Sequence, residues 1–78
     1  MKIFGRITRH CSADGLVELS EVTFVASPEA LREIAVFLHK AADHMEQTGE
    51  RFGHSHIQDE VEGWADHEPG RPDVIVAS

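Results

Sequence analysis

Apolar and polar residues alternate along the first part of the chain. In KIFGRITRH (residues 2–10), Ile3, Gly5 and Ile7 fall on one side of an extended segment. In LVELSEVTFVA (residues 16–26), Val22, Phe24 and Ala26 alternate with Thr23 and Val25. A period of two is typical of β-strands, and the SADG segment between them is rich in turn formers. The pattern predicts a β-hairpin.

Residues 27–49 change to a helical period, with a start signal and a stop signal. Ser27 is placed to cap a helix, Pro28 suits its first position, and Gly49 suits the left-handed closing conformation. The apolar positions predict one stripe along this helix: Leu31, Ile34, Ala35, Leu38, Ala41, Ala42 and Met45.

After Gly49 the strand-like alternation returns in RFGHSHIQD, and the β-branched DVIVA segment follows an acidic loop. The element order is therefore ββαββ. We expect the α+β class, with a four-stranded, mainly antiparallel sheet and one long helix packed on one face. The sequence leaves the strand order open.

One helix covers only one face of such a sheet. Apolar residues such as Ile3, Ile7, Leu19, Val25 and Ile57 do not all fit beneath it. Apolar surface is therefore left for another molecule, either a second copy in a homodimer or a different protein.

Size and charge limit the classes of function that suit this chain. A chain of 78 residues suits a single domain over residues 1–78 with one small core, which favours a binding protein over an enzyme. The net charge of −7 opposes binding to nucleic acid or to anionic membranes.

Other features indicate a cytoplasmic protein. Cys11 has no second cysteine to pair with, and MKIFGRITRH lacks the apolar run of a signal peptide or membrane span. His10 is next to Cys11, but neighbours on an extended segment point to opposite faces, so a plain thiol is favoured over a catalytic one.

His54 and His56 would project from the same face of a strand, which is a spacing that can chelate zinc. Asp59, Glu60 or His67 would have to complete the shell. The alternative is a strand with two exposed histidines and no metal. We expect no cofactor, with zinc as the candidate should there be one.

Residues 59–68, DEVEGWADHE, contain acids and no lysine or arginine. The predicted partner-binding residues are Asp59, Glu60, Glu62, Trp64, Asp66 and Glu68. A solvated loop is the plain interpretation of the acids. For Trp64 two interpretations stand: it closes the small core, or it is an exposed anchor ringed by acids that meets a basic protein.

The segments LSEVTFVASPEALREIAVFLHKAADHM, FGHSHIQD, GW and PDVIV together resemble a family of small bacterial immunity proteins from polymorphic toxin systems. The resemblance covers roughly residues 19–77. It implies a cytoplasmic protein that binds and neutralises a cognate toxin, and it brings no catalytic residues with it.

Overall fold

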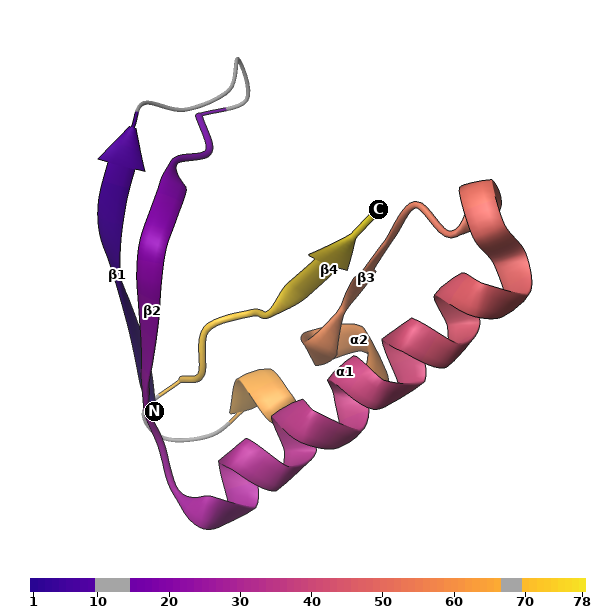
Figure 1. Cartoon of the computed structure of the whole chain (residues 1–78). Coiled ribbons are helices and arrows are strands. Elements are labelled where there is room, and N and C mark those ends of the chain that lie inside the picture. The colour runs from indigo at the N-terminus through magenta and orange to yellow at the C-terminus, as the bar shows by residue number, and fades with distance from the viewer. Residues whose placement is uncertain (10–14, 67–69) are drawn as a thin grey trace.

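The computed structural model describes residues 1–9, 15–66 and 70–78. Most of the predicted SADG turn, together with Cys11, His67 and Glu68, lies outside these residues. The strands are β1 (Lys2–Arg9), β2 (Glu18–Val25), β3 (His54–His56) and β4 (Ile75–Ala77). The helices are α1 (Pro28–Thr48), η1 (Gly49–Arg51), α2 (Ile57–Glu60) and η2 (Trp64–Asp66). The α+β class and the ββαββ order are confirmed (Figure 1).

The strands pair antiparallel as two separate ladders, β1 with β2 and β3 with β4, and not as the one four-stranded sheet expected. The physical reason is the length of the second ladder. Both β3 and β4 are three residues long, so they offer few backbone groups for a further strand to pair with. The β1–β2 hairpin consequently extends away from α1, as Figure 1 shows.

Helix α1 begins and ends where the sequence predicts. The hydroxyl of Ser27 accepts a hydrogen bond from the Ala30 amide at 3.1 Å, and Pro28 follows at the first helical position. Gly49 closes the helix with a φ of 57°, a conformation that glycine adopts without a steric penalty.

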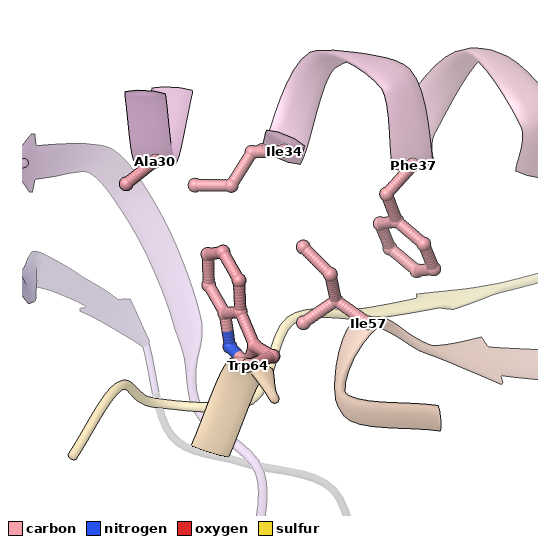
Figure 2. Close-up of a cluster of buried hydrophobic side chains, with 5 residues drawn as sticks. All are labelled: Ala30, Ile34, Phe37, Ile57 and Trp64. Atoms are coloured by element: carbon pink, nitrogen blue, oxygen red, sulfur yellow. The ribbon is translucent and has the colours of Figure 1, made fainter. Parts of the chain in front are cut away.

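The core lies between α1 and the segment that follows β3. Figure 2 shows its central cluster, in which Trp64 and Ile57 point at the side of α1 that carries Ala30, Ile34 and Phe37. The buried stripe of the helix is therefore rotated from the predicted one. Two residues of the expected stripe, Ile34 and Ala41, are buried. Four others are exposed: Leu31, Ala35, Leu38 and Ala42.

The hairpin is connected to this core at its base. Met1, just before β1, and Ala26, just after β2, are partly buried and pack against the central cluster. Most of the hairpin side chains that the structure describes are exposed. Within the described parts of the chain, no helix has both the length and the apolar character needed to cross a membrane.

Candidate functional site

Four of the predicted partner-binding acids are exposed and lie close together in the sequence: Asp59, Glu60, Glu62 and Asp66. We call this set the acidic ridge. Asp59 and Glu60 belong to the single turn of α2, and Asp66 belongs to η2. The inward positions of the same segment are apolar, because Ile57 is buried and Val61 is half-buried. Burial of these apolar positions turns the carboxylates towards water.

Trp64 is a core residue, and its side chain is 1% exposed. Its indole N–H donates a hydrogen bond to the Pro72 carbonyl at 2.9 Å. The guanidinium of Arg71 lies 4.6 Å from the ring centroid and also bonds Glu33 at 2.8 Å. Of the two interpretations of Trp64, burial of the indole favours closure of the core. Contact of Trp64 with a partner stays a prediction.

The ridge acids have no lysine or arginine close to them in the sequence. No lysine or arginine occurs between Phe52 and Asp66 in the sequence. Arg71, the next base along the chain, is committed to Glu33 and to the indole of Trp64. Among the residues that the structure describes, no ion pair joins a ridge carboxylate to a base. Such a surface is complementary to a basic one on another molecule.

The two histidines of β3 are neighbours, as predicted, with ring centroids 5.1 Å apart. Nδ1 of His56 is 2.5 Å from a carboxylate oxygen of Asp73, so that nitrogen is already engaged. Within the described residues, no group of three or more histidine, cysteine, aspartate or glutamate side chains is placed to hold a metal ion. Zinc binding by His54 and His56 stays a prediction. Calorimetric titration with zinc tests it: the wild type should show a heat of binding, and the His54→Ala, His56→Ala variant should show none.

Asp73 is a residue that the sequence interpretation missed. One carboxylate oxygen contacts His56, and the other accepts hydrogen bonds from the amides of Gln58 and Val74, at 3.2 and 3.0 Å. Burial would raise the pKa of this carboxyl, but these hydrogen bonds and the charge of His56 outweigh it and lower the pKa below 3.8. Through these contacts Asp73, which precedes β4, links this part of the chain to the junction between β3 and α2. No local spacing in the sequence connects position 73 with position 56.

Residues 21–78 match a family model described as Immunity protein 32. The matched segment includes α1, the acidic ridge, β3 and β4. It confirms the resemblance to bacterial immunity proteins. The searches of curated proteins and of solved structures found no match.

Proposed function

Because this chain belongs to the Immunity protein 32 family over residues 21–78, we propose that it binds and neutralises a cognate bacterial toxin without catalysing a reaction. Membership of the family is the observation that carries the proposal. The partner is a protein, and the proposed compartment is the cytoplasm.

The acidic ridge is the proposed contact surface for the toxin. Its four carboxylates are exposed and close in sequence, and a basic toxin surface would be attracted to them before contact. A toxin that acts on a polyanionic substrate has a basic surface of this kind. Occupying it with carboxylates would both speed association and block the substrate.

The support beneath the ridge favours binding as well. Ile57 and Trp64 are both almost fully buried, and the indole N–H of Trp64 is bonded to the backbone at Pro72. A segment that is fixed by its buried side chains loses little conformational freedom when a partner binds. The rigid support therefore reduces the entropic cost of presenting the acids.

The test is co-purification of the full chain with each protein encoded beside it, scored for a stoichiometric complex and for rescue of growth. In a complex so identified, the Glu60→Lys, Glu62→Lys variant should weaken binding about tenfold or more, because the partner then meets like charges. A matched control is the Glu46→Lys, Glu50→Lys variant. It makes the same change in net charge at exposed positions at the other end of α1 and in η1.

Comparing the two variants separates the effect of charge at the ridge from the effect of the net charge of the chain on binding. Weaker binding by the ridge variant, with the control close to the wild type, supports the ridge as the contact surface. Equal affinities for the two variants would remove the ridge from the interface. Absence of a complex with any neighbour-encoded protein would contradict toxin binding itself.

A further inference from the structure

Between Ile3 and Ile7, one face of the β1–β2 hairpin is apolar. The antiparallel register pairs Ile3 with Phe24, Gly5 with Val22 and Ile7 with Leu19, and directly paired residues share a face. The irregular register beside Ile7 is what brings Leu19 to this side. We call this surface the hairpin face, and it consists of Ile3, Gly5, Ile7, Leu19, Val22 and Phe24.

Gly5 confirms how these side chains lie. A Cβ built on Gly5 would be 2.6 Å from a methyl carbon of Leu19, so the leucine side chain extends across the glycine. The small residue lets Leu19 spread over the strand beside it and makes the surface continuous. The opposite face is different, because it carries an ion pair in which Arg6 bonds Glu21 at 2.7 Å.

Most of the hairpin face is uncovered. Ile3 is half-buried, and the exposed fractions of the other four large side chains run from 39% at Phe24 to 66% at Ile7. Four large side chains so exposed offer on the order of 400 Å² of apolar surface, which is comparable with the largest patch of a typical monomer, roughly 300–600 Å². A sheet face of this composition is ordinarily buried against a helix or another sheet.

Helix α1 has an uncovered apolar stripe of its own, which we call the helix stripe: Leu31, Ala35, Leu38 and Ala42. Each member is one residue later than a buried residue of the same helix, namely Ala30, Ile34, Phe37 and Ala41. One residue corresponds to a rotation of about 100° around a helix. The apolar surface of α1 is therefore about twice as wide as its own core covers.

We infer that the occupant of both surfaces is a second copy of this chain, with the hairpin face of each copy packed on the helix stripe of the other. A sheet face and a helix stripe are the two halves of an ordinary α/β layer, and one chain carries both without joining them. A two-fold arrangement forms the contact twice and leaves neither surface exposed. Together the two surfaces reach on the order of 600–800 Å² per chain, close to the ~800 Å² per partner of a stable interface.

Charge is compatible with this dimer. Each chain has a net charge of −7, so association would be opposed wherever acids meet. The hairpin face has no charged residue, and the helix stripe has none either. Neither surface includes a residue of the acidic ridge, so the proposed dimer and the proposed toxin contact use different residues.

The test is the oligomeric state of the full chain, measured by light scattering after size exclusion at several concentrations up to about 100 µM, where a micromolar dimer is well populated. We expect a dimer. Val22→Lys on the hairpin face and Leu38→Lys on the helix stripe should each raise the dissociation constant at least about tenfold, because each buries an unpaired charge in the interface.

The chain offers matched controls for both variants. Val25 lies on the opposite face of β2 and is 54% exposed, against 50% for Val22. Val36 lies off the helix stripe and is 53% exposed, against 45% for Leu38. Val25→Lys and Val36→Lys should leave the dimer intact. Ile7→Asp is a second hairpin-face variant, and circular dichroism verifies that each variant is folded.

Three results would overturn the inference: a wild-type monomer at the highest concentration, dimers retained by Val22→Lys and Ile7→Asp, or a dimer retained by Leu38→Lys. Rescue of growth from a toxin is scored separately. A monomer that still neutralises its toxin would refute the dimer and leave the proposed function standing.

Discussion

Replacing Trp64 with alanine would remove the largest side chain of the core. The indole is 1% exposed, donates to the Pro72 carbonyl and lies beneath Arg71. Truncating a buried tryptophan to alanine typically costs about 3–5 kcal/mol, from the lost burial and the cavity left behind. A domain of 78 residues has a free energy of unfolding of about 4–12 kcal/mol. We therefore expect Trp64→Ala to remove a large part of the stability.

Urea unfolding followed by far-ultraviolet circular dichroism measures this loss, since Trp64 is the only tryptophan and its fluorescence disappears with the substitution. A milder variant, Trp64→Phe, should cost about 1–3 kcal/mol, because it keeps most of the ring but leaves the Pro72 carbonyl without its donor. Val25→Ala is the control: the side chain is exposed, and the expected change is within about 0.5 kcal/mol.

A cost below about 1 kcal/mol for Trp64→Ala would refute the buried position of the indole. Binding to the toxin provides an independent check. Trp64→Phe, studied where it is fully folded, should keep the wild-type affinity. A loss of affinity with unchanged stability would instead restore the interpretation of Trp64 as a partner anchor.

Three further outcomes are expected. Ser27→Ala should lower the free energy of unfolding by about 1 kcal/mol through loss of the cap on α1, as measured by urea unfolding; an effect no larger than that of Ser20→Ala would contradict it. Because folding lowers the pKa of Asp73, this carboxyl stabilises the fold above its ordinary pKa of 3.8, and the stabilisation is lost as the pH falls through the lowered value. Thermal unfolding of Asp73→Asn between about pH 6 and 3 should thus show a weaker acid dependence than the wild type, while Asp43→Asn should follow the wild type. Raising the salt concentration from about 0.05 to 0.5 M should slow association with the toxin and leave dissociation nearly unchanged; an unaffected association rate would argue against steering by the ridge.

The predictable parts of the fold are those with local signals. Ser27, Pro28 and Gly49 define the bounds of α1 through contacts within a few residues, so the sequence predicts them directly. The hairpin follows from alternation in two adjacent segments. The single turn of α2 was not predicted, because its four residues are too few to show a helical period.

The features that were not predictable depend on residues distant in the sequence. Which side of α1 is buried is decided by where Trp64 and Ile57 approach it, and the helix sequence is apolar on a wider arc than they cover. The separation of the two ladders likewise depends on how β3 and β4 meet. The acids of the ridge were identifiable from composition, whereas the bond between His56 and Asp73 joins positions 17 residues apart.

Within residues 57–66, the buried residues and the exposed acids have separate roles, and this separation affects how the protein can evolve. Its buried members, Ile57 and Trp64, hold the segment in place, and the four ridge acids contribute no side chain to the core. Mutations at the ridge positions therefore escape the stability penalty that constrains the residues beneath them. With the ridge as the proposed contact surface, a lineage facing a changed toxin could alter its specificity at these positions while keeping the same scaffold.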